Sequence, residues 1–123
     1  MEETRHYLYR IQPTRYEMLT EGATPEEDEI IGEHFAYLEG LTMEGVAILV
    51  GRTLTTDQDT MGIVIFTARS DGEARALMNA DPAVSKGVMR AKLFPFRIAL
   101  QAATDGPNDR IQTPVEADIF KEQ

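Results

Sequence analysis

Apolar residues along the chain follow two different periods, which divide it into strands and helices. Short segments rich in β-branched and aromatic residues predict strands at 6–11, 46–54, 62–68 and 91–100. Apolar residues spaced three and four apart predict helices at 24–44 and from 70 to about 80. The segment between the first strand and the first helix shows no period and is predicted to be a long loop.

Helix start and stop signals support these boundaries. Thr24 and Glu27 are placed to form a capping box, and Gly45 lies where a glycine commonly ends a helix. Ser70 and Glu73 have the same spacing and predict a second capping box at the start of the second helix.

The resulting order is strand, helix, strand, strand, helix, strand, which predicts an α+β, ferredoxin-like βαββαβ fold with an antiparallel sheet. Pro95 cannot donate a ladder hydrogen bond and predicts an edge or a bulge in the last strand. Two helices cover only one face of such a sheet. Because the segment 46–50 is almost wholly apolar, the other face should be covered as well, and we expect a homodimer with two sheets packed face to face.

Length and composition favour a single domain that spans residues 1–100. The chain has 123 residues, within the usual size of a single domain. Residues 101–123 show no clear period and are predicted to be a C-terminal tail, either a loop or an extension that covers the partner subunit.

Charge and cysteine content exclude several function classes. The net charge of −9 repels phosphate, so nucleic acid and anionic membrane are poor partners. The absence of cysteine excludes thiolate nucleophiles and cysteine-ligated metals. No apolar run reaches the ~20 residues of a membrane span and the N-terminal residues do not resemble a secretory signal, so a cytoplasmic protein is expected.

His34 and Asp81 are the first candidates for chemistry. His34 lies midway between Ile30 and Leu38 at four-residue spacing, so its side chain should point to the buried face of the first helix or its margin. An imidazole there is suited to proton transfer, especially beside a carboxylate, but it is equally suited to a structural role in the core or at a dimer interface. Asp81 precedes Pro82, which breaks the second helix, and such an aspartate is well placed to cap the helix that restarts there.

Arg52 is the third candidate. It ends the second strand, where it either clamps an anionic group of a ligand or pairs with a surface acid. The two histidines of the chain, His6 and His34, have no metal-binding spacing, so no metal site is predicted. No phosphate loop or dinucleotide fingerprint occurs, and we expect no cofactor.

Three segments together resemble the YCII-related family. They are Glu33-His34-Phe35-Ala36-Tyr37-Leu38, Ile48-Leu49-Val50-Gly51-Arg52, and the stretch from Asn79 to Val88 that contains Asp81-Pro82, followed by Lys92-Leu93-Phe94-Pro95-Phe96. The resemblance implies a dimeric α+β barrel with a His–Asp active site, in which His34 and Asp81 take those roles. The sequence departs from the family pattern at two places. The family often has Ala-Gly-Pro after the second strand, where this chain has Val50-Gly51-Arg52. The family also commonly has an aromatic residue after Asp-Pro, where this chain has Ala83.

Two functions follow from this resemblance. The first is a cofactor-independent enzyme of lyase or isomerase type, which carries out acid–base chemistry on a small metabolite with His34 and Asp81 while Arg52 binds the substrate. The second is a non-catalytic ligand-binding or regulatory module that uses the same pocket.

Overall fold

The computed structural model describes residues 4–102 and contains one four-stranded antiparallel sheet. The elements are β1 (Arg5–Pro13), α1 (Glu17–Thr20), α2 (Pro25–Met43), β2 (Ala47–Arg52), β3 (Gly62–Ala68), α3 (Asp71–Ala80), α4 (Pro82–Ser85) and β4 (Met89–Phe96). The strands lie in the order β2-β3-β1-β4, and all neighbours are antiparallel. This arrangement confirms the predicted α+β ferredoxin-like fold.

Several boundaries differ from the prediction: β2 spans Ala47–Arg52 rather than 46–54, and β4 begins at Met89 rather than at residue 91. The segment expected to be a loop contains the single-turn helix α1, which has no buried residue and no side-chain cap, so it leaves no periodic signal in the sequence. Strand β4 ends at Phe96 rather than residue 100. It pairs only with β1, where Phe96 faces His6, so the last strand stops where its partner begins. Pro95 therefore lies on an edge strand, as predicted.

The helix caps follow the sequence signals with one correction. The Thr24–Glu27 capping box forms in full. Gly45, just after the end of α2, has a positive φ of 80°, the left-handed conformation that commonly ends a helix. At α3, the Ser70 hydroxyl accepts from the Glu73 amide, but the Glu73 carboxylate accepts from the amide of Arg69 instead of Ser70. The second box is only half formed, because Glu73 also pairs with the Arg69 guanidinium at 3.0 Å.

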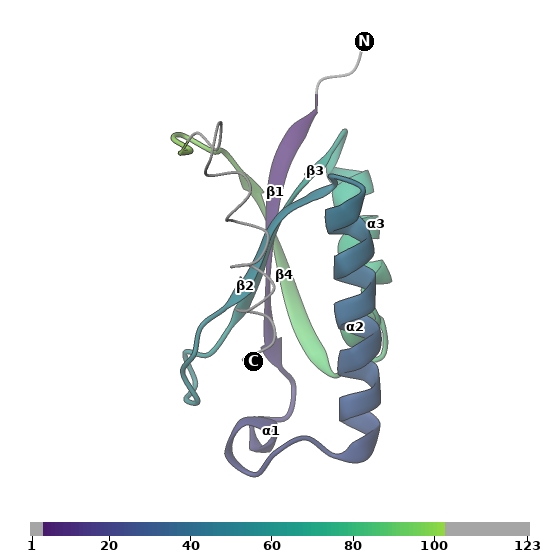
Figure 1. The fold of residues 1–123 in the computed structure, drawn as a ribbon, viewed down its shortest axis with the longest axis vertical. Helices are drawn as coiled ribbons and strands as arrows, with labels where there is room; N and C mark the ends of the chain where they lie inside the picture. The colour runs from purple at the N-terminus through teal and green to yellow at the C-terminus, as the bar shows by residue number, and fades with distance from the viewer. Residues whose placement is uncertain (1–3, 103–123) are drawn as a thin grey trace, which may run out of the picture.

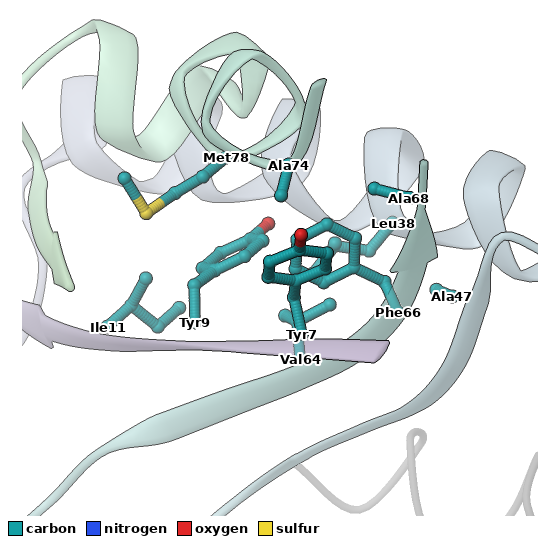
Figure 2. Close-up of a cluster of buried hydrophobic side chains, with 10 residues drawn as sticks. All are labelled: Tyr7, Tyr9, Ile11, Leu38, Ala47, Val64, Phe66, Ala68, Ala74 and Met78. Carbon is teal, nitrogen blue, oxygen red and sulfur yellow. The ribbon is translucent and has the colours of Figure 1, made fainter. Parts of the chain in front are cut away.

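Helices α2 and α3 lie on the same side of the sheet (Figure 1). The core fills the layer between these helices and the sheet. Alternate residues of β1 point into it, and Tyr7, Tyr9 and Ile11 are all buried there. Figure 2 shows the two tyrosine hydroxyls directed toward the helices, next to Ala74 and Met78 of α3.

Among residues 4–102, no helix lies over the other face of the sheet (Figure 1). The strand register places an apolar row across this face, formed by Leu49, Ile65, Leu8 and Phe94. Leu49 is 50% exposed, so within one chain β2 is covered on one face only. We expected a homodimer from the apolar segment 46–50, and this partly exposed apolar row is a surface that a second copy would cover; the homodimer stays a prediction.

The remaining predictions on organisation concern the ends of the chain and the membrane. The predicted tail 101–123 lies, beyond Ala102, outside the described residues. Between residues 4 and 102, no helix is long and apolar enough to cross a membrane.

Candidate functional site

His34 and Asp81 lie in direct contact, although 47 positions separate them in the sequence. His34 projects from the middle of α2, and Asp81 forms the extended link between α3 and α4. The Nδ1 atom of His34 is 2.8 Å from Oδ1 of Asp81 and 2.9 Å from Oδ2. The fold therefore brings the two candidate residues together.

Asp81 is fully buried and has two further hydrogen bonds. Its Oδ1 accepts from the amide of Ala83 at 2.9 Å, which makes it the cap of α4. Its Oδ2 accepts from the hydroxyl of Tyr9 at 2.7 Å. The capping role and the contact with His34 thus coexist, because a carboxylate has enough lone pairs for several donors.

These contacts determine how the imidazole is oriented. The Asp81 carboxylate serves as an acceptor for Tyr9 and Ala83, and we assign the proton of His34 to Nδ1, from which it donates to the same carboxylate. In the neutral ring Nε2 is then the basic nitrogen. A carboxylate on one side of an imidazole and a free nitrogen on the other is the arrangement of a general base.

Nε2 of His34 is accessible. The side chain is 13% exposed, and within the described part of the chain no recorded partner contacts Nε2. No buried side-chain nitrogen or oxygen there is left without a hydrogen bond, so an unpaired Nε2 must reach open space. His34 lines a cavity of about 370 Å³, whereas Asp81 does not.

The cavity lies between the helix-facing side of the sheet and α2, and residues of α1 form part of its wall. Its wall is mainly apolar: Ile11, Val50 and Val64 come from the sheet, Ile31 and Leu38 from α2, and Met18 and Leu19 from α1. Gly62 leaves room in the sheet, because a side chain there would approach Ile11 to 3.0 Å. A volume of this size fits a small metabolite.

Arg52 also lines this cavity. It pairs with Gly62 across β2 and β3, and Gly62 pairs with Ile11 of β1, so Arg52 starts on the same face of the sheet as the cavity. Its Nε donates to the carbonyl of Thr53 at 3.0 Å. No ion pair of Arg52 with a carboxylate is recorded between residues 4 and 102, which leaves the rest of the guanidinium for an anionic ligand.

Tyr9 was not anticipated from the sequence. Burial, followed by the nearby charge of Asp81 and the hydrogen bond to it, raises the pKa of the Tyr9 hydroxyl far above its usual range, so it remains a donor. The available signal was the position of a tyrosine on the inward face of a strand, because a buried tyrosine hydroxyl usually has a partner.

Two contacts hold α2 against the helices that carry Asp81. The Tyr37 hydroxyl donates to the carbonyl of Leu77 at 2.7 Å. Glu33, next to His34, pairs with Lys86 just after α4 at 2.7 Å, and this hydrogen bond raises the pKa of the Lys86 ammonium. Both contacts keep the His34–Asp81 distance short.

The α1 segment is held over the cavity by Arg15 and Glu27. The Arg15 guanidinium donates to both oxygens of Glu27 at 2.9 and 2.7 Å and also to the carbonyl of Gly22 at 3.3 Å. The hydrogen bonds from Arg15 and from the Thr24 amide lower the pKa of Glu27 to about 2. The same carboxylate that caps α2 therefore fixes the segment that carries Met18 and Leu19.

Potential metal ligands do not cluster in the described part of the chain. Nowhere in residues 4–102 do three or more histidine, aspartate or glutamate side chains form a group that could hold a metal ion.

Fold and site together define a class: a small α+β protein in which a histidine beside an apolar cavity contacts a buried aspartate. The chain belongs to the YCII-related domain family, which it matches over residues 10–97. The matched region runs from β1 to just past β4 and contains His34, Arg52 and Asp81. The resemblance inferred from the sequence is thereby confirmed.

A solved structure shares this fold. It is 5-chloro-2-hydroxyhydroquinone dehydrochlorinase (TftG) from Burkholderia phenoliruptrix AC1100, in complex with 2,5-dihydroxybenzoquinone. The two chains are 19% identical, with a TM-score of 0.55 over 74% of this chain and 93% of the other. No curated protein matches the sequence.

Proposed function

We propose that this protein is an enzyme that transfers protons on a small metabolite without a cofactor, in an isomerisation or an elimination. The observation that carries the proposal is the contact of His34 Nδ1 with buried Asp81 at 2.8 and 2.9 Å, which directs Nε2 to the cavity. Membership of the YCII-related family supports it.

His34 acts first as the base in this scheme. Nε2 takes a proton from an acidic C–H or O–H group of the substrate, and the electron pair of that bond forms a new double bond. In an isomerisation the imidazolium returns the proton to another atom of the substrate. In an elimination the leaving group departs with its bonding pair, chloride as the free anion, and the imidazolium then releases its proton to water or to a basic leaving group. Asp81 stabilises the imidazolium in either case.

Arg52 and the apolar wall define the substrate. The guanidinium binds a carboxylate or phenolate oxygen, and the apolar side chains of the cavity pack against a planar, hydrophobic body. The dehydrochlorinase TftG, which shares the fold, was solved in complex with 2,5-dihydroxybenzoquinone, a compound of this general shape. Hydroxylated aromatic compounds and quinones are therefore the first ligands to test.

The protein also acts as a homodimer in this proposal. The row of Leu8, Leu49, Ile65 and Phe94 is the surface that a second copy would cover. Light scattering should give about twice the chain mass of 13.8 kDa. A mass of one chain at micromolar concentration would contradict the dimer.

The second candidate function is ligand binding without turnover in the same cavity. It is favoured by the position of Arg52, which would hold an anionic ligand even if His34 transferred no proton. In that case the protein would report or buffer a metabolite.

One set of variants separates the two functions. With a chlorinated hydroxyhydroquinone as the first probe and chloride release as the readout, we expect His34→Ala and Asp81→Asn to lower kcat/KM by about 10²–10⁴-fold. His6→Ala and Asp71→Asn are matched controls outside the cavity and should keep wild-type turnover. If probes bind and none is turned over by the wild type, the enzyme proposal is wrong and the binding module is favoured. If both site variants retain wild-type turnover, His34 and Asp81 are not the catalytic pair.

A further inference from the structure

Tyr9 contacts Asp81 but is not part of the cavity wall. Its ring is 1% exposed and packs edge-on against Phe66 at 5.7 Å, and its hydroxyl points toward the helices (Figure 2). Neither Tyr9 nor Asp81 lines the cavity, so neither touches a ligand there. Anything that Tyr9 contributes to the site must reach it through Asp81 and His34.

The donors around Asp81 are unequal. The Ala83 amide, two residues away in the chain, fixes Oδ1 through local geometry alone. Oδ2 has only Tyr9 at 2.7 Å besides the contact with His34 at 2.9 Å. Without the Tyr9 hydroxyl, the Ala83 amide alone would hold the carboxylate besides His34, and rotation of the carboxylate could move its oxygens out of line with Nδ1.

We infer that Tyr9 is a positioning residue, which holds the Asp81 carboxylate in the orientation that keeps His34 protonated on Nδ1 and leaves Nε2 as the base. The inference rests on the proposed function, because the tautomer matters for turnover only if His34 transfers a proton. It assigns a third member to the His–Asp pair, contributed by β1.

The chain provides its own control in Tyr7. Tyr7 lies two residues earlier on the same face of β1, is equally buried and packs on the same Phe66 ring. Its hydroxyl also donates to an aspartate at 2.7 Å, but that aspartate is Asp71, which contacts no histidine in the recorded hydrogen bonds of residues 4–102. Tyr7→Phe therefore removes an equivalent hydroxyl without altering the surroundings of His34.

The test is nitrogen NMR of the histidine rings in the full chain. The chain has two histidines, so His34→Gln identifies the His34 signals by their loss. We expect wild type and Tyr7→Phe to show only the Nδ1–H tautomer of neutral His34, and Tyr9→Phe to show a mixture with the Nε2–H tautomer. A single Nδ1–H tautomer in folded Tyr9→Phe would overturn the inference and leave Tyr9 a core residue.

A second variant applies if Tyr9→Phe does not fold. Replacing Tyr9 by 3-fluorotyrosine keeps the ring and the hydroxyl but makes the hydroxyl a stronger donor. Because it draws more charge from Asp81, the Nδ1 proton of His34 should move upfield, and the same replacement at Tyr7 should leave that proton unmoved. An unmoved proton in the Tyr9 variant would also overturn the inference.

This NMR test needs no substrate, so its outcome is independent of the proposed function. A tautomer mixture in Tyr9→Phe together with full turnover in His34→Ala would support the positioning role and contradict proton transfer by His34. Once a substrate is known, Tyr9→Phe should lower kcat with little change in KM, because Tyr9 does not touch the ligand.

Discussion

Tyr7 and Tyr9 place the same chemical group in two different surroundings. Each hydroxyl donates to an aspartate at the start of a helix at 2.7 Å. Asp71 is exposed, and Tyr7 and Asp71 both line a shallow, open cavity at the end of the sheet. Asp81 is fully buried, and the next residue in contact with it is His34.

The comparison shows that two things distinguish the pair at Asp81 from the pair at Asp71: Asp81 is buried, and a third element, α2, brings His34 into contact with it. The hydrogen bond to Asp71 is the main cause that raises the pKa of Tyr7, whereas burial is the main cause for Tyr9. Helix α2 passes over α4, where Asp81 is the cap, and brings His34 to it. A tyrosine–aspartate pair alone is therefore a structural contact, and it gains a possible chemical role only in an enclosed place next to an imidazole.

The largest difference is expected when the aspartates are removed. Asp81→Ala takes away a helix cap and leaves the buried donors of Tyr9 and His34 without an acceptor, so we expect a loss of about 3 kcal/mol in the free energy of unfolding. Asp71→Ala should cost about 1 kcal/mol, because water can replace the exposed carboxylate. Urea denaturation measures both. Equal losses would show that the burial of Asp81 has no energetic effect.

Removing the hydroxyls should give a smaller difference in the same direction. Tyr9→Phe loses a buried hydrogen bond to a charged group, for which we expect about 2 kcal/mol. Tyr7→Phe should lose clearly less, since its hydroxyl lies beside the open cavity. The same denaturation experiment tests this, and a Tyr7 variant as unstable as the Tyr9 variant would reverse the comparison.

Alkaline pH should separate the two tyrosines further. The folded pKa of Tyr9 is raised above its unfolded value of about 10, so the stability it provides is present below about pH 10 and decreases as the pH rises further. We expect Tyr9→Phe to flatten the decline of unfolding free energy above about pH 10 more than Tyr7→Phe does. Identical alkaline slopes in wild type and Tyr9→Phe would contradict the strong burial of this hydroxyl.

The smallest effect concerns the two glutamates that begin the helices. Glu27 holds the α1 segment over the cavity, whereas Glu73 pairs with Arg69 at the start of α3. Glu27→Gln should raise the Kd of a cavity ligand a few-fold. It should also reduce the loss of stability that wild type shows as the pH falls from 4.5 toward about 2, because the folded pKa of Glu27 is lowered. Titration calorimetry with a hydroxyquinone gives the Kd.

Glu73→Gln is the matched variant, since the pKa of Glu73 is also lowered by an arginine. It should leave the Kd unchanged. A similar change in Kd for both glutamines would mean that the α1 segment does not control access to the cavity.

Much of the fold was predictable because its signals are local. Thr24 and Glu27 mark the start of α2 through contacts within one turn. Pro82 ends the helical conformation between α3 and α4 through its own geometry. The full capping box predicted at Ser70 does not form, because Arg69, one residue outside the motif, competes for the Glu73 carboxylate.

The site was predictable only in part. His34 and Asp81 were identified as candidates by helical spacing, a proline and a family resemblance, and Arg52 by its place at a strand end. Tyr9 and the α1 segment escaped prediction, because a tyrosine in an alternating strand and a single helical turn are common and carry no sign of their partners.

The sequence by itself determined the elements, their order and the capping role of Asp81, since each depends on residues a few positions apart. Only the tertiary structure decided that Asp81 meets His34 and Tyr9, from 47 and 72 positions away, because such distances depend on how α2, α4 and β1 pack. It also decided that Asp81 is enclosed while Asp71 is open, and this burial separates a candidate site from an ordinary helix start.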